Sequence, residues 1–387
     1  GGGTTRQVSA DNVSINNLSR IEVSFSPTPD TQASALAGAV ELVPRSAFER
    51  SRPKFDYTVY YEMRDNARDF RPTPGPGKDP EAKANPGFDF VYILPVNRRF
   101  GLTLSGGYSK TYSDQEQIDT TWRGVRSATN GTTFPNTTSD RPYLTSLYDR
   151  TNPKMMRRTG ASLTFDYKLS DSDQVSINLV YARNYLVQMA HTITFNVTQV
   201  PAGQFTLDWT RGAVGQGNAT IDNIASFNDN HTYMPTMTWR HRGLNWEANA
   251  GLAHSQAEAY SYGGPGGAFR TALAQRQGIT LWFDGFNGQK PASITATDGV
   301  TGAAVDLHNI NSYVLRSAGD NLVRSSDVKR TAYLNVTRRY GTEVPFTVKG
   351  GLDIRQALRG QRNSSLTLTY VGADGRASTS PVTGDDQ

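Results

Sequence analysis

The chain of 387 residues carries 40 Lys and Arg against 35 Asp and Glu, which gives a net charge of +5, and it contains no cysteine. The absence of cysteine excludes disulfide scaffolds and thiolate metal sites, and the mild charge gives no argument for nucleic-acid binding. No apolar run approaches the 18 or so residues of a membrane helix, so a helical membrane protein is also excluded. A membrane β-barrel remains compatible with the mean hydropathy of −0.54, because half of each of its strands can face water.

The first 46 residues differ in composition from the rest of the chain. Two short apolar segments, at 21–23 and 40–43, enclose a proline break and the small-residue stretch 32–38. This pattern predicts a compact α/β piece with two short strands, followed by a proline-containing connection over 44–53.

From residue 55 onward, the main signal is the alternation of apolar and polar residues. In 55–64, Phe55, Tyr57 and Val59 share one face, while Asp56 and Thr58 share the other. Such a period of two predicts a strand with one apolar and one wet face. The same pattern recurs at 102–108, 161–169, 175–181, 237–239, 246–252, 332–336 and 346–354, whereas 88–94 is apolar in both phases.

The connections between these strands alternate between short and long. Short turns are expected at 95–101, 170–174, 241–245 and 340–345. Long polar loops are expected at 65–87, 113–155, 186–231 and 255–328. This alternation is typical of a membrane barrel, which has tight periplasmic turns and long extracellular loops.

Aromatic residues mark both ends of the expected membrane crossings. One set lies beside the short turns and comprises Tyr167, Trp239, Trp246, Tyr340 and Phe346. A second set, Tyr61, Tyr108 and Tyr181, lies about six to nine residues further along the strands. Two such rows are expected at the two lipid interfaces of a barrel.

The opening segment resembles the end of the plug domain of TonB-dependent outer-membrane receptors. The matching residues are Arg20-Ile21-Glu22-Val23, Ser26-Pro27 and the stretch from Ala37 to Arg45. Within that stretch Ala37, Glu41 and Pro44 depart from the family pattern, which indicates a divergent branch of the family.

The resemblance implies an all-β protein, an antiparallel transmembrane β-barrel of roughly 22 strands closed around a plug domain. Residues 1–46 are then the C-terminal part of the plug, and residues 47–387 are the N-terminal part of the barrel with long extracellular loops. About nine or ten of the strands are expected in this chain, so we expect it to be an interior fragment of such a receptor.

The resemblance further implies active transport across the bacterial outer membrane. An extracellular ligand (a siderophore, cobalamin or an oligosaccharide) would be imported to the periplasm, with energy from the TonB–ExbB–ExbD complex acting on the plug. Outer-membrane lipid is the other expected partner. Neither a cofactor nor an enzyme activity is expected, because the five histidines show no metal-ligand spacing and no catalytic motif stands out.

Two groups of residues are candidates for the function. Arg20 occupies the place where the family has an arginine that pairs with barrel carboxylates, so it is a candidate plug–barrel contact. Aromatic and arginine side chains of the long stretches could stack on ligand rings or grip carboxylates, although packing of the loops against one another is the more common role of such residues. These candidates are Trp122, Arg123, Trp209, Arg211, Tyr260, Tyr262 and Trp282.

Alternative functions remain open at this stage. A closed outer-membrane barrel of about ten strands could be an enzyme or a passive porin, although neither gives residues 1–46 a role. A soluble β-rich binding protein or adhesin would bury Tyr57, Leu163, Phe165 and Trp239 between two sheets.

Overall fold

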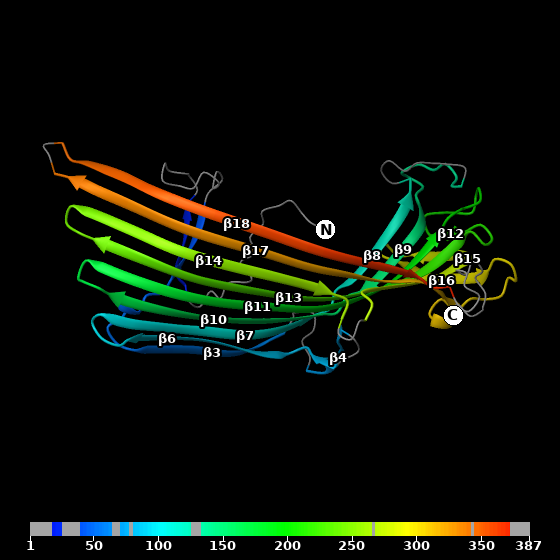
Figure 1. Cartoon of the computed structure of the whole chain (residues 1–387). Helices are drawn as coiled ribbons and strands as arrows, with labels where there is room; N and C mark the ends of the chain where they lie inside the picture. The colour runs from blue at the N-terminus through cyan, green and yellow to red at the C-terminus, as the bar shows by residue number, and fades with distance from the viewer. Residues whose placement is uncertain are drawn as a thin grey trace.

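The computed structural model describes residues 18–24, 39–63, 70–76, 80–124, 133–264, 268–341 and 344–371. Nine strands follow one another as an antiparallel meander and form one large curved sheet (Figure 1). They are β3 (Lys54–Glu62), β6 (Asn85–Pro95), β7 (Phe100–Ser113), β10 (Lys154–Lys168), β11 (Asp173–Val197), β13 (Gly217–Arg242), β14 (Trp246–Tyr262), β17 (Val314–Tyr340) and β18 (Phe346–Thr369). The expected all-β antiparallel architecture is therefore confirmed.

The short connections lie where the alternation predicts them. β6 ends at Pro95 and β7 begins at Phe100, while β10 ends at Lys168 and β11 begins at Asp173. The β13–β14 and β17–β18 turns are equally short, and all four lie at the same end of the sheet (Figure 1). Within the described residues, β3 pairs only with β6 and β18 pairs only with β17, so both outer edges of the sheet are open.

The long connections differ from the expectation. The stretches 113–155, 186–231 and 255–328, expected as polar loops, contain five further strands and the extensions of β11, β13, β14 and β17. The five strands are β8 (Glu116–Arg123), β9 (Tyr143–Thr151), β12 (Trp209–Arg211), β15 (Thr271–Phe286) and β16 (Pro291–Asp298). We call them, with the strand ends that pair with them, the distal module; it lies at the far end of the sheet from the short turns (Figure 1).

The distal module has its own hydrophobic core. Tyr143 on β9 is fully buried, as are Ile279, Leu281 and Phe283 on β15. Phe195 and Val197 at the end of β11 belong to the same buried cluster. A core of this kind stabilises a folded unit, whereas polar loops would have none. In the stretch 65–87 the described part contains β4 (Pro72–Pro74) and β5 (Pro80–Ala82), which pair with each other, and the first residues of β6.

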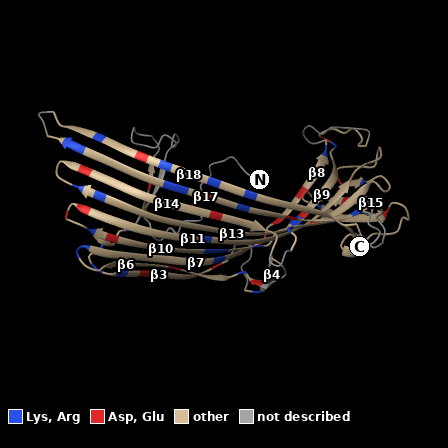
Figure 2. Cartoon of the chain, in the orientation of Figure 1, with Lys and Arg blue, Asp and Glu red and all other residues tan. Residues whose placement is uncertain are grey.

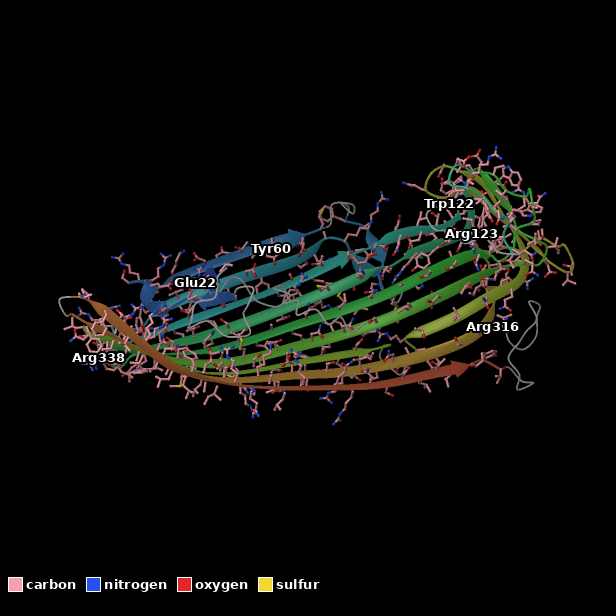
Figure 3. All side chains as sticks on the ribbon, turned by 90° about the horizontal axis from the view of Figure 1, so that it is seen from above. Glu22, Tyr60, Trp122, Arg123, Arg316 and Arg338 are labelled. Atoms are coloured by element: carbon pink, nitrogen blue, oxygen red, sulfur yellow. The ribbon has the colours of Figure 1, made fainter. Side chains whose placement is uncertain are left out.

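The N-terminal segment forms a separate strand pair. β1 (Leu18–Ser24) is antiparallel to β2 (Ala39–Pro44), and the pair lies on the concave side of the sheet (Figures 1 and 3). The two expected short strands are thus present, whereas Ser26-Pro27 and Ala37-Gly38 lie outside the described residues.

A 3₁₀ turn, η3 (Ala47–Glu49), joins this pair to the sheet. One carboxylate oxygen of Asp166 on β10, Oδ2, accepts from the Ala47 amide at 2.8 Å and the Ser46 hydroxyl at 2.9 Å. The other oxygen accepts from Gln174 and Ser176 on β11. The carboxylate of Asp166, only 1% exposed, therefore ties the connection to the concave face of the sheet.

Candidate functional site

The two faces of the sheet have opposite chemistry. Large apolar side chains on the convex face are exposed to solvent. Tyr57 on β3 is 69% exposed, and Leu252 on β14 is 60% exposed. Cross-strand pairs join such residues into continuous rows, for example Ile177, Met237, Leu252, Ala332 and Ile354 on β11, β13, β14, β17 and β18. An exposed apolar surface of this extent is typical of contact with lipid or another protein.

The concave face carries polar side chains that bond across the strands. The hydroxyls of Ser105 and Ser162 lie 3.2 Å apart, and Thr164 donates to Asn178 at 3.2 Å. On the other half of the sheet the amide of Asn335 donates to Asn249 at 3.0 Å. Figure 2 shows Lys and Arg recurring along β17 and β18. The predicted separation of apolar and polar side chains onto opposite faces is present, but Ser105, Ser162 and Thr164 are at most 4% exposed, so this part of the polar face is buried and not wet.

Aromatic rings border the apolar face beside the short turns. The His241 ring stacks on Trp246 at a centroid distance of 3.8 Å, and Tyr340 stacks on Phe346 at 4.8 Å. Trp239 donates its indole N–H to Asp173 at 3.2 Å, and His241 Nδ1 lies 2.9 Å from the same oxygen. These contacts fix the first aromatic row that the sequence predicts.

The second row lies further along the strands. Phe88 stacks on Tyr108 with centroids 6.2 Å apart, and Tyr181 lies 5.2 Å from Tyr233. Beyond this row the convex face becomes charged, and Arg183 forms a two-point ion pair with Asp229 at 2.8 and 2.9 Å. The apolar face is therefore a band with an aromatic and then a polar boundary.

Two of the predicted ligand residues serve the packing of the distal module. Trp122 meets Phe286 edge-to-face with centroids 4.4 Å apart, and its indole donates to Thr120 at 3.0 Å. The guanidinium of Arg123 lies 3.9 Å above the ring of Phe134. Figure 3 shows Trp122 and Arg123 together in the distal module. Their positions fit the packing interpretation of these residues.

Three other predicted residues form one cluster, the tryptophan–arginine platform of Trp209, Arg211 and Trp282. The Arg211 guanidinium lies 5.2 Å from the ring of Trp209 and 5.3 Å from that of Trp282. Asp284 holds Arg211 by an ion pair at 2.5 Å, and β12 pairs with β15 through Trp209 and Asp284. Because 38% of Trp282 is exposed, the platform offers aromatic surface to a ligand.

Tyr260 and Tyr262 lie apart from this platform, at the end of β14. Their rings are 4.9 Å apart, and Tyr262 stacks on Phe227 of β13 at 5.4 Å. Burial raises the pKa of Tyr262. For Arg20 only the backbone is described, and it pairs with Val43 in the β1–β2 pair. The predicted contact of its side chain lies outside the described residues.

Sequence reasoning missed a polar interruption in the apolar face. In β17 the outward positions run Val336, Leu334, Ala332 and then Arg330. Arg330 is flanked by His254 on β14 and Gln356 on β18. The sequence signal for this interruption is Arg330 itself, a charged residue at a position where the alternation calls for an apolar one.

The described residues contain no group of three or more His, Asp or Glu side chains arranged to hold a metal ion. In the same part of the chain, no helix has the length and apolar character needed to cross a membrane. Comparison with protein-family models, with curated proteins and with solved structures finds no match to this chain.

Proposed function

We propose that this chain is part of a TonB-dependent outer-membrane receptor that imports an extracellular ligand. The observation that carries the proposal is the exposed apolar band on the convex face, bordered by aromatic rows and backed by a polar concave face. Lipid contact stabilises such a band, whereas water contact would leave it as an aggregation-prone surface. Further strands of the receptor would pair with the open edges of β3 and β18 and complete the barrel.

The arrangement argues against a soluble two-sheet protein. Such a protein would bury the outward Tyr57, which is 69% exposed in this sheet. A passive porin shares the banded face, but it gives no role to the β1–β2 pair on the concave side. The plug assignment of residues 1–46 accounts for that pair, and the TonB–ExbB–ExbD complex would supply the energy for import.

The tryptophan–arginine platform is the best-supported ligand contact within the proposal. Trp209 and Trp282 present aromatic surface beside the ion-paired Arg211, at the end of the protein that would face the medium. Aromatic surface of this kind suits a sugar ring or the ring of a siderophore.

The orientation can be tested with single cysteines, because the natural chain has none. Val300, in the turn that follows β16 of the distal module, is 90% exposed, and Leu244 in the β13–β14 turn is 96% exposed. In cells expressing the whole receptor, a membrane-impermeant maleimide should label Val300→Cys directly. It should label Leu244→Cys only after the outer membrane is permeabilised. Equal labelling of both variants in intact cells would contradict the proposal.

Energised import needs a second test. Strains lacking either the receptor or TonB should be compared for growth on iron siderophores, cobalamin and oligosaccharides. The proposal predicts that both deletions abolish the use of the same nutrient. If growth on the nutrient is lost in the strain without the receptor but kept in the strain without TonB, the passive-porin interpretation would be favoured.

A further inference from the structure

A groove interrupts the convex face where β13 and β14 separate. The β13–β14 ladder pairs Tyr233 with Gln256 and resumes at Thr236 with Ala253, so Pro235 has no partner on β14. Proline has no N–H to donate to a ladder, which explains the gap. The groove measures about 560 Å³ and extends from Ile177 on β11 to Ile354 on β18.

The groove combines an apolar floor with a polar edge. Its floor follows the apolar row of Ile177, Met237, Leu252, Ala332 and Ile354. The neighbouring row supplies His254, Arg330 and Gln356, which line the same groove.

Arg330 is the charged group at this edge. Its guanidinium donates to the side-chain oxygen of Gln356 at 3.4 Å. Among the described residues it forms no ion pair with a carboxylate, in contrast to Arg183, Arg211 and Arg276. An exposed arginine without a counter-ion at an apolar surface offers charge and hydrogen bonds to an anionic partner.

The position of Arg330 along its strand indicates which membrane boundary it reaches. It lies ten residues from Tyr340, which belongs to the aromatic row beside the short turns. At about 3.3 Å per residue and a strand tilt of about 40°, this spacing corresponds to about 25 Å along the membrane normal. That is about the height of the apolar band of an outer-membrane barrel, so Arg330 lies at the boundary opposite the short turns.

We propose that this groove binds lipid A, the phosphorylated and multiply acylated glycolipid of the outer leaflet. The inference rests on the proposed function, which makes the boundary away from the short turns the outer leaflet. Arg330 and Gln356 bind a phosphate of the headgroup, with His254 beside them. An acyl chain lies on the apolar floor that Pro235 opens between β13 and β14.

The test measures lipid binding by the whole receptor in detergent, with native mass spectrometry as the readout. The probes are diphosphoryl lipid A, dephosphorylated lipid A and phosphatidylglycerol. Loss of one charge-assisted contact predicts about tenfold weaker binding of diphosphoryl lipid A by Arg330→Gln. Arg330→Lys keeps the charge and should retain part of the affinity.

Arg338→Gln is the matched control, because Arg338 lies on the same face of β17 at the short-turn end, 5.0 Å from the ring of Tyr340 (Figure 3). This variant should bind lipid A as the natural protein does, and circular dichroism should show the same strand content in all variants.

Three results would overturn the lipid A site. They are unchanged binding by Arg330→Gln, equal binding of dephosphorylated lipid A, and equal binding of phosphatidylglycerol. If the cysteine-labelling pattern holds and one of these results appears, the lipid site alone is wrong. Equal labelling of Val300→Cys and Leu244→Cys in intact cells would instead remove the membrane placement on which the site depends.

Discussion

At the scale of single residues, buried charges hold the distal module together. Asp298 is 5% exposed and accepts at Oδ1 from the amides of Val300 and Thr301, at 3.0 and 2.8 Å. Its Oδ2 receives the guanidinium of Arg276 at 2.8 Å. Nearby, burial raises the pKa of Tyr313 to about 12, and its hydroxyl donates to the Leu307 carbonyl at 2.6 Å.

The Asp298 carboxylate should make the distal module sensitive to acid. The amide of Thr301, followed by that of Val300 and by Arg276, lowers the pKa of Asp298 below its usual value of about 3.9. Because the folded-state pKa is the lower one, the stabilisation is present above about pH 4 and is lost as the pH falls through the folded-state pKa. After correction for the intrinsic exchange rate, the protection of residues 276–303 against hydrogen exchange should therefore decrease below pH 4.

Two substitutions at this position separate charge from shape. Asp298→Ala removes both the ion pair with Arg276 and the acceptor for the turn amides. It should lower the free energy of unfolding by about 3 kcal/mol, because it leaves the buried Arg276 without a partner. Asp298→Asn keeps an acceptor for the turn amides and should cost less, while removing the acid sensitivity contributed by this group. Wild-type exchange rates in the alanine variant at pH 7 would contradict the assignment.

At the scale of elements, the strands next to the short turns could be predicted and the distal strands could not. Near the turns, one face of each strand meets a polar interior and the other is apolar, which produces the alternation seen in Phe346, Val348 and Leu352. In β15, the three consecutive residues Ile279, Thr280 and Leu281 are all buried. A strand packed on both faces has no period of two, so the alternation that identified the other strands is absent from β15.

The same limit applies to the candidate ligand residues. The sequence pattern could identify Trp122 and Trp282 as aromatic residues outside the expected strands. It could not distinguish a ring packed in a core from a ring exposed to a ligand. That distinction depends on contacts made by residues distant in sequence, such as Phe286 beside Trp122 and Asp284 beside Arg211.

The two tryptophans should therefore respond differently to alanine substitution. Trp122→Ala removes the ring that packs on Phe286 and should destabilise the distal module by about 3 kcal/mol. Trp282→Ala should leave proteolytic stability nearly unchanged, and it should weaken uptake if the platform binds the ligand. Limited proteolysis of the whole receptor measures the first effect, and uptake at equal surface expression measures the second. Equal proteolytic sensitivity of the two variants would show that Trp122 has no packing role of its own.

At the scale of the whole molecule, the five tryptophans divide into two groups. Trp239 and Trp246 border the apolar band beside the short turns. Trp122, Trp209 and Trp282 belong to the distal module, beyond the opposite boundary of the band. The proposed membrane placement puts the first group at a lipid interface and the second group in water.

This division predicts how fluorescence responds to brominated lipids, which quench only tryptophans near their acyl chains. In reconstituted receptor, a variant with Trp122, Trp209 and Trp282 changed to Phe retains the border pair. The emission of Trp239 and Trp246 should be quenched more strongly by bromines near the lipid headgroup than by bromines near the ends of the acyl chains. The reason is that interfacial tryptophans lie at the headgroup level. The converse variant, with Trp239 and Trp246 changed to Phe, should show no quenching from the distal three.

Tryptophans elsewhere in the whole receptor are removed in both variants, and vesicles of the same lipid without bromine give the reference intensity. Quenching of the distal group as strong as that of the border pair would mean that the apolar band does not end where the aromatic rows place its edge. Absence of quenching in both groups would mean that the convex face does not contact lipid, and a protein partner would then have to cover it. The expected difference between the variants follows from a band of one membrane thickness with the distal module outside it.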